Sequence, residues 1–163
     1  MKKLLFTLSL VLIGYTSALA QSGFTLGANI GMPVGDIEDY SDFKIGADIA
    51  YRVNVVPMVD VGGLVGYSRF FIDDVDSPFG SLETNDIEFI PIAASGRVNF
   101  ALLFVGADLG YAIGLDDEND GGFFYRPLVG VKLGPVGVIG SYSGINVDGN
   151  PIGSINLGVE FGF

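Results

Sequence analysis

Apolar residues recur at every second position through most of this chain. The last nine residues, INLGVEFGF, alternate Ile, Leu, Val, Phe and Phe with Asn, Gly, Glu and Gly, and seven earlier segments follow a similar pattern. A period of two is typical of a β-strand, whereas an amphipathic helix repeats every 3.6 residues. The sequence therefore predicts eight strands, over residues 23–32, 43–55, 59–68, 90–99, 104–113, 125–134, 136–145 and 155–163, of which the Gly- and Ser-rich seventh is the weakest.

Short and long connections alternate between these segments. The short set comprises residues 55–58, 100–103 and 134–135. The long set, which is acidic, comprises residues 36–42, 72–86, 115–122 and 147–153. Segments of about ten residues can cross a bilayer at a tilt, and an even number of them can close into a barrel without a free edge. We therefore predict an all-β fold: an eight-stranded antiparallel up-and-down transmembrane β-barrel.

Two prolines interrupt the pattern. Pro91 lies inside a predicted strand and lacks the N–H that a ladder hydrogen bond needs, so we expect a bulge or an irregular pair there. Pro127 poses a similar problem near a strand end.

The amino-terminal stretch, MKKLLFTLSLVLIGYTSALA, has the layout of a secretory signal peptide. Lys2 and Lys3 precede a short apolar core, and Ala18-Leu19-Ala20 is a small-x-small cleavage site. The apolar core is too short to span a bilayer, which takes about 20 residues. We expect cleavage after Ala20, which gives a signal peptide at residues 1–20 and a barrel domain at residues 21–163.

Charged residues sort into two places. Without Lys2 and Lys3, six basic residues remain against 19 acidic ones, a net charge of −13. The strand face that carries Gly and polar residues holds Lys44, Asp48, Arg52, Asp60, Arg97, Asp108, Arg126, Lys132 and Glu160. Arg69 lies at a strand end, and the other 15 carboxylates lie in or beside the long connections. If the apolar face meets lipid, these nine charged residues form a nearly balanced network that fills the narrow interior of an eight-stranded barrel.

A soluble barrel of the lipocalin kind, with its apolar face inward, is the alternative for the same periodicity. Its outer face should be rich in Lys and Glu, but the second face of this chain is rich in Gly and Ala. The signal peptide and the unequal connections also favour the membrane barrel.

The final strand also carries a family resemblance. The terminal Phe of NLGVEFGF resembles the assembly signal of bacterial outer-membrane barrels, with Phe161 and Phe163 as its aromatic residues. Segments such as IEFIPIAASGRVNF and FVGADLGYAIG are similar to the fourth and fifth strands of the OmpX-like and outer-membrane β-barrel domain families, and the likeness spans residues 22–163.

This resemblance implies a monomer in the outer membrane of a Gram-negative cell envelope, surrounded by outer-membrane lipid and lipopolysaccharide, with both termini in the periplasm. It also implies that the barrel-assembly machinery and periplasmic chaperones are partners during biogenesis. It implies no particular activity, because function cannot be inherited from a fold.

The residues offer little for catalysis or metal binding. The chain has no Cys and no His, which removes the thiol nucleophile and the commonest general base and metal ligand. Asp116, Glu118 and Asp120 approximate half of a calcium loop, but Pro127 stands where the bidentate Glu is needed and no helices flank it, so we expect neither a metal nor a cofactor. The acidic charge argues against nucleic acid as a partner.

The leading hypothesis is therefore a non-catalytic structural or surface-interaction barrel with a filled lumen and acidic extracellular loops. A passage or binding barrel for small or hydrophobic compounds is the alternative. A lipid-modifying membrane enzyme is less favoured, because such barrels generally use a His.

Overall fold

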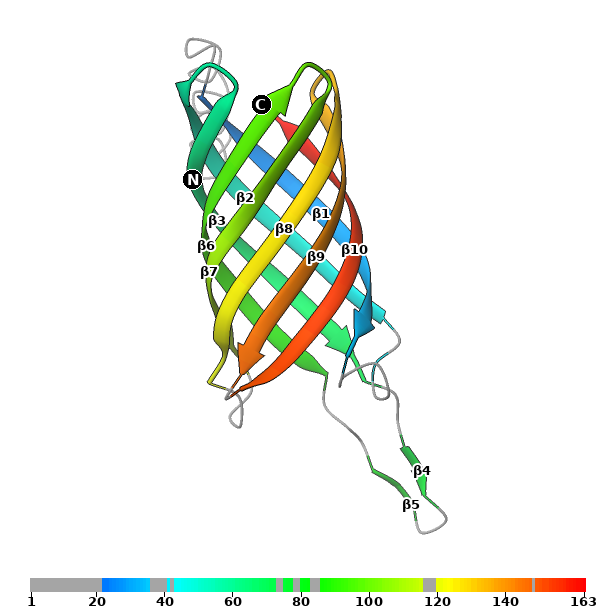
Figure 1. Cartoon of the computed structure of the whole chain (residues 1–163). Coiled ribbons are helices and arrows are strands. Elements are labelled where there is room, and N and C mark those ends of the chain that lie inside the picture. Colours follow the sequence, from blue (N-terminus) through cyan, green and yellow to red (C-terminus); the bar gives the residue numbers. More distant parts are fainter. Residues whose placement is uncertain are drawn as a thin grey trace, which may run out of the picture.

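The alternating segments become strands that close on one another in the computed structural model (Figure 1). The structure describes residues 22–35, 41, 43–72, 75–77, 80–82, 86–115, 120–147 and 149–163. The predicted signal peptide, residues 1–20, lies outside this part of the chain.

Eight strands of 12 to 14 residues form the barrel wall, so the predicted fold is confirmed and its strands are longer than expected. They are β1 (Ser22–Val34), β2 (Phe43–Val56), β3 (Val59–Phe71), β6 (Ile87–Phe100), β7 (Leu103–Gly114), β8 (Gly122–Leu133), β9 (Val136–Val147) and β10 (Asn150–Gly162). Each strand pairs antiparallel with its neighbours, and β1 pairs with β10 to close the sheet. At this seam Phe24 N–H donates to Phe163 O at 3.2 Å, and Phe163 N–H donates to Phe24 O at 3.0 Å.

The two ends of the barrel differ (Figure 1). Two-residue turns at 57–58, 101–102 and 134–135 join strands at one end, where the carboxy-terminus also lies; we call it the short-turn end. The opposite end, the long-loop end, carries the longer connections. A small hairpin of β4 (Val75–Ser77) and β5 (Gly80–Leu82) extends from it, within a segment for which the sequence predicted only a connection.

One predicted long connection is wrong. Residues 147–153 were expected to form a loop, but β9 ends at Val147 and β10 begins at Asn150. The sequence there contains Asp-Gly, a dipeptide that favours two-residue hairpin turns because its Gly tolerates a positive φ. Gly149 has φ of 89°, and Asn150 pairs with Val147.

The prolines leave gaps in pairing, not a bulge. Between β3 and β6 the pairs Val65–Ile92 and Ser68–Phe89 share one register, and none is recorded between them. Pro91 still pairs in register with Ala112 on β7. The expectation of a bulge or an irregular pair is therefore met by an irregular pair, because Pro only removes a donor and fits the pleat. Pro127 shows the same gap toward β9.

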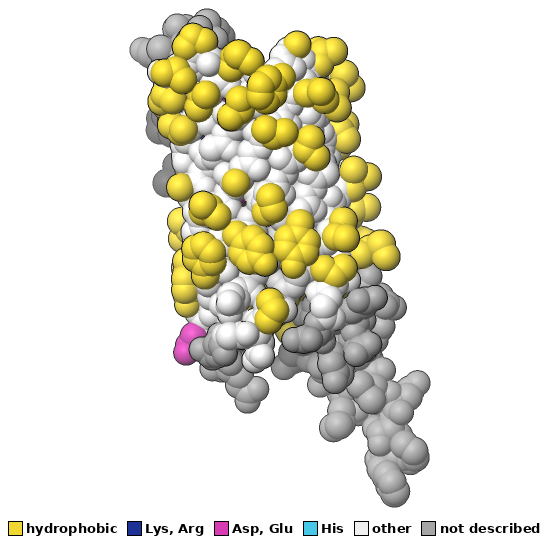
Figure 2. Space-filling view, in the orientation of Figure 1, with side chains coloured by type: hydrophobic (Ala, Val, Ile, Leu, Met, Phe, Trp, Pro, Cys, Tyr) yellow, Lys and Arg dark blue, Asp and Glu magenta, His cyan; other side chains and the backbone are white. Residues whose placement is uncertain are grey.

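The apolar face of every strand points outward. Large exposed side chains such as Leu26, Leu109, Ile155 and Leu157 each show more than half of their surface. Figure 2 shows hydrophobic side chains over the barrel wall and no Lys or Arg on the face it presents. The soluble, lipocalin-like alternative is therefore wrong, because its apolar face would be inside. No helix in the described part of the chain is long and apolar enough to cross a membrane.

The interior also contains an apolar cluster, at the long-loop end. Phe70, Phe89, Phe124 and Ile145 are buried there, and Phe70 and Phe89 meet edge to face at 6.2 Å between ring centroids. The sequence predicted only charged residues in the lumen. Phe70, Phe89 and Phe124 lie one or two positions beyond the predicted strand limits, and the strands extend past those limits, which brings more side chains into the barrel.

Candidate functional site

The lumen is the candidate site, because the strands direct their charged side chains into it. Three levels follow one another from the long-loop end to the short-turn end. They are a polar pocket around Lys44, a middle layer of Asp48, Arg126 and Asp108, and a wider space around Arg52 and Arg97.

The middle layer is held by one guanidinium. Arg126 Nε donates to Asp108 Oδ2 at 2.8 Å, and Arg126 Nη1 donates to Asp48 Oδ2 at 2.8 Å. Asp108 is the register partner of Arg126 on β7, whereas Asp48 reaches it from β2 across the lumen. Asp108 is fully buried. Gly27 leaves the space for Asp48, because a Cβ at Gly27 would lie 2.7 Å from Asp48 Oδ1.

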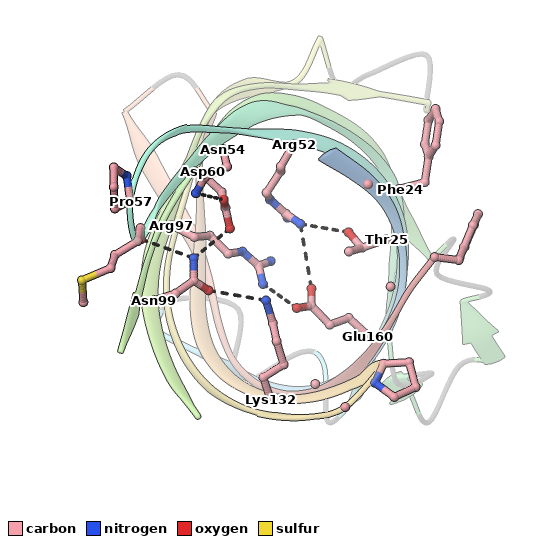
Figure 3. A pocket seen from close by; sticks show the side chains of 17 residues that line it. Phe24, Thr25, Arg52, Asn54, Pro57, Asp60, Arg97, Asn99, Lys132 and Glu160 are labelled. Carbon is pink, nitrogen blue, oxygen red and sulfur yellow. Dashed lines mark hydrogen bonds and ion pairs between the residues drawn. The ribbon is translucent and has the colours of Figure 1, made fainter. Parts of the chain in front are cut away.

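The next layer joins three strands around Glu160 on β10. Arg97 Nη1 donates to Glu160 Oε1 at 2.7 Å, and Arg52 Nη1 lies 4.0 Å from Glu160 Oε2. Arg52 is also held by neutral hydroxyls: its Nε donates to Ser95 Oγ at 2.7 Å and its Nη1 to Thr25 Oγ1 at 2.9 Å. Figure 3 shows both arginines and Glu160 pointing into the lumen.

Three of the nine predicted network residues form no ion pair among the described residues. Asp60 accepts from Asn54 Nδ2 at 3.0 Å and from Asn99 Nδ2 at 2.7 Å, although Arg97 is its register partner on β6. Lys132 Nζ lies 3.5 Å from Asn99 Oδ1. The long Arg97 side chain reaches Glu160 instead. Asp60 and Lys132 therefore contact the neutral amides of Asn54 and Asn99 and not a group of opposite charge.

Lys44 is the third. Its Nζ donates to Ser143 Oγ at 2.7 Å, to Ser154 Oγ at 3.1 Å and to Asn156 Oδ1 at 3.2 Å. A serine beside a lysine is an arrangement that some hydrolases use for nucleophilic attack. Here all four side chains are buried, and the adjoining cavity has a volume of only about 20 Å³. That space holds about one water molecule and no acyl substrate.

Among the described residues, the lumen widens toward the short-turn end. Two cavities of about 20 Å³ each adjoin Arg126 and Asp48. At the short-turn end a cavity of about 630 Å³, which we call the vestibule, is lined by Arg52, Asp60, Arg97, Lys132 and Glu160 (Figure 3). The apolar cluster lies at the opposite end.

The remaining predicted site residues lie elsewhere. Asp116 and Glu118 are outside the described residues, and Asp120 is exposed. The described residues contain no group of three or more His, Cys, Asp or Glu side chains that could hold a metal ion. Phe161 and Phe163 point outward with exposed fractions of 49% and 53%, and their rings lie 6.2 Å apart.

Sequence reasoning missed the neutral partners of the charged groups. They are Thr25, Asn54, Ser95, Asn99, Ser143, Ser154 and Asn156. A signal was available for five of them, because Asn54, Ser95, Asn99, Ser154 and Asn156 share a strand and its parity with a predicted lumen residue, but only charged residues were considered. Thr25 and Ser143 lie on β1 and β9, which carry no predicted lumen charge.

Comparisons with known proteins agree on the barrel. No family model matches the chain, and no curated protein does. Among solved structures, Ail, the attachment invasion locus protein of Yersinia pestis, is similar with a TM-score of 0.62 and 16% identity over 88% of this chain and 98% of Ail. The fold is that of a small outer-membrane β-barrel. Ail in a phospholipid bilayer nanodisc is similar with a TM-score of 0.55 and 17% identity, over 85% of this chain and 99% of that one.

A de novo designed transmembrane β-barrel is also similar, with a TM-score of 0.55 and 10% identity over 86% of this chain and 95% of the design. Such low identities establish the fold alone. Activity must therefore be argued from the lumen and the surface of this chain.

Proposed function

We propose that this chain is a monomeric outer-membrane β-barrel of a Gram-negative bacterium, exported with cleavage after Ala20 and folded with both termini in the periplasm. The fold, the apolar outer wall and the signal-peptide pattern support this location. Mass spectrometry of the membrane fraction tests the export step. Gln21 should be the first residue, and a protein that still begins at Met1 would contradict it.

Its role is structural or depends on surface contacts, with a filled lumen and no catalysis. The observation that carries this proposal is the narrowness of the lumen around Arg126, where the two cavities are about 20 Å³ each. A cavity of that size holds about one water molecule, so these two cavities give ions little room to pass the Arg126 layer of the described lumen. The apolar cluster at the long-loop end adds a second barrier.

Passage of small compounds is the second candidate, because the vestibule gives access to the lumen from one side. Planar-bilayer recording separates the two. The wild type should give no steady ionic conductance. A variant with Phe124→Gly and Arg126→Gly, which removes inward side chains from both barriers, should conduct and serves as the positive control. Steady conductance by the wild type would favour passage.

The long, acidic connections are the surface that would meet partners outside the cell. Ail has been crystallised with the heparin analogue sucrose octasulfate, but the negative charge of the present chain makes such a polyanion a poor ligand. Orientation can be tested with single cysteines, because the chain contains none. An impermeant maleimide on intact cells should label Asp120→Cys, in a long connection, and spare Pro135→Cys, in a short turn. The reverse pattern would invert the proposed topology.

A further inference from the structure

The vestibule concentrates basic side chains in an acidic protein. Three cationic side chains line it, from Arg52, Arg97 and Lys132, against two acidic side chains, Asp60 and Glu160, and Phe163 at the end of the sequence also lines it. The full chain has a net charge of −11, so this concentration of basic groups runs against the composition as a whole. Confined basic groups attract anions, because the low-dielectric walls focus the field.

Two arginines of the vestibule also have N–H donors without an acceptor. Arg52 and Arg97 are only 7% and 5% exposed, yet Arg52 Nη2 and Arg97 Nε have no acceptor among the described residues. A guanidinium carries five N–H donors and stays protonated, so these donors persist at any physiological pH. Both side chains point into the vestibule (Figure 3). The site is therefore short of acceptors, which an oxyanion would supply.

The two carboxylates are already engaged. Glu160 is bound to Arg97 and lies beside Arg52, and Asp60 accepts from Asn54 and Asn99. Lys132 is exposed, and its one recorded hydrogen bond among the described residues is the 3.5 Å contact to the amide of Asn99.

Lys132 and Arg97 also share a neighbour. Lys132 Nζ lies 5.9 Å from the centroid of the Phe104 ring, and Arg97 Cζ lies 4.8 Å from the same centroid. An ammonium and a guanidinium thus lie near the same buried ring.

We propose that the vestibule binds a phosphate group on Arg52, Arg97 and Lys132. Forked guanidinium donors match the geometry of a phosphate oxyanion, and an ammonium adds a point charge. The cavity of about 630 Å³ is in the size range of small-molecule sites. The phosphate can belong to a free solute or to a lipid headgroup at the barrel rim, since both present the same oxyanion.

Titration calorimetry of the folded barrel in maltoside micelles, which contain no phosphate, tests this site. Inorganic phosphate and a short-chain phosphatidylglycerol are the two probes, and the one that binds more tightly identifies the source. Lys132→Gln should weaken binding about tenfold, the usual effect of losing one hydrogen bond to a charged group. Glu160→Gln should tighten it, because it removes a negative charge and frees the guanidinium of Arg97.

Arg69→Gln is the matched control, because it removes one positive charge at the opposite end of the barrel. Its affinity for either probe should equal that of the wild type. Equal weakening by Lys132→Gln and Arg69→Gln would reduce the effect to general charge attraction and overturn the proposal. The absence of saturable binding by both probes to the wild type would overturn it as well. The result is independent of conductance, since a closed lumen leaves the vestibule accessible.

Discussion

At the scale of single residues, Arg126 decides the electrostatics at the centre of the lumen. It is the only cation that bridges two carboxylates within hydrogen-bonding distance in the described lumen, one from β2 and one from β7. Removing a charged partner from a buried pair leaves the other charge uncompensated, which typically costs about 3–5 kcal/mol. The loss of Arg126 would leave two carboxylates without a cationic partner, whereas the loss of Asp108 would leave Arg126 paired with Asp48.

This asymmetry predicts an order of stabilities. Arg126→Gln should lower the free energy of unfolding by about 3–5 kcal/mol. Asp108→Asn should lower it by about 1–3 kcal/mol, because one buried hydrogen bond is disturbed while the charge of Arg126 stays balanced. Asp120→Asn, in an exposed position, should change it by less than about 1 kcal/mol. Urea unfolding in lipid vesicles measures all three, and identical midpoints would show that the buried network does not hold the barrel together.

Asp86 links the end of β3 to the start of β6 at the long-loop end. Arg69 Nε donates to Asp86 Oδ2 at 2.7 Å, and the backbone N–H of Ile72 donates to Asp86 Oδ1 at 3.1 Å. The hydrogen bond from Arg69 is the main cause that lowers the pKa of Asp86 below its ordinary value, and the one from Ile72 adds to it. A depressed pKa in the folded state means that ionisation of Asp86 favours the folded link.

The link should therefore be complete above the unfolded pKa of about 3.9 and be lost as the pH falls through the lower folded value. The amide resonance of Ile72, followed by NMR from pH 6 to pH 2, should titrate with a midpoint below 3.9. Asp86→Asn should abolish this titration, and Asp120→Asn should leave it unchanged. A midpoint at or above 3.9 in the wild type would contradict the assignment.

At the scale of strands, period-two alternation was enough to predict the eight segments and, for all but the weak seventh, the face that each presents to the lumen. It could not predict where strands end, because pairing with a neighbour extends a strand past its alternating core. Phe70, Phe89 and Phe124 lay just outside the predicted ranges for this reason, so the apolar cluster that they form with Ile145 was not predicted.

The contacts inside the lumen depend on strand pairing and side-chain reach, which periodicity does not contain. Parity placed Asp60 and Arg97 on the same face, but only the three-dimensional arrangement shows Arg97 turning to Glu160. Lys44 likewise had the parity of a network residue, yet it binds hydroxyl and amide oxygens. It is therefore easier to predict which residues face the lumen than to predict which residues they contact there.

Phe163 helps to hold β1 and β10 together at the seam that closes the barrel. Its backbone exchanges two hydrogen bonds with Phe24, and the two rings stack at 6.4 Å between centroids. Deleting Phe163 removes these contacts between β1 and β10, the first and last strands of the barrel, whose pairing closes the sheet. Deletion should therefore slow insertion into vesicles several-fold, whereas Ile152→Val, at the other end of β10, should insert at the wild-type rate. Equal rates for the deletion and the wild type would show that the seam closes without this residue.

At the scale of the whole molecule, the main feature is the closure of the sheet. Every barrel strand has a partner on both sides, so the sheet presents no free edge at which unfolding or aggregation can begin. The same architecture occurs in a designed barrel that shares 10% of its residues with this chain, which shows how little of the sequence the wall requires. What distinguishes this chain is the set of side chains in its lumen. The contribution of sheet closure and that of the lumen side chains can be tested separately.

Closure predicts resistance to detergent. Without heating, the wild type should migrate faster on a dodecyl sulfate gel than after boiling, because the paired wall keeps the chain compact until thermal unfolding. Arg126→Gln should keep the fast unheated form but lose it at a lower temperature, since the wall remains closed while the interior is weakened. Deletion of Phe163 should give a larger slow fraction without heating, because the seam itself is damaged. If the wild type showed a single mobility at all temperatures, the closed wall would not control unfolding, and the separation of wall from interior would fail.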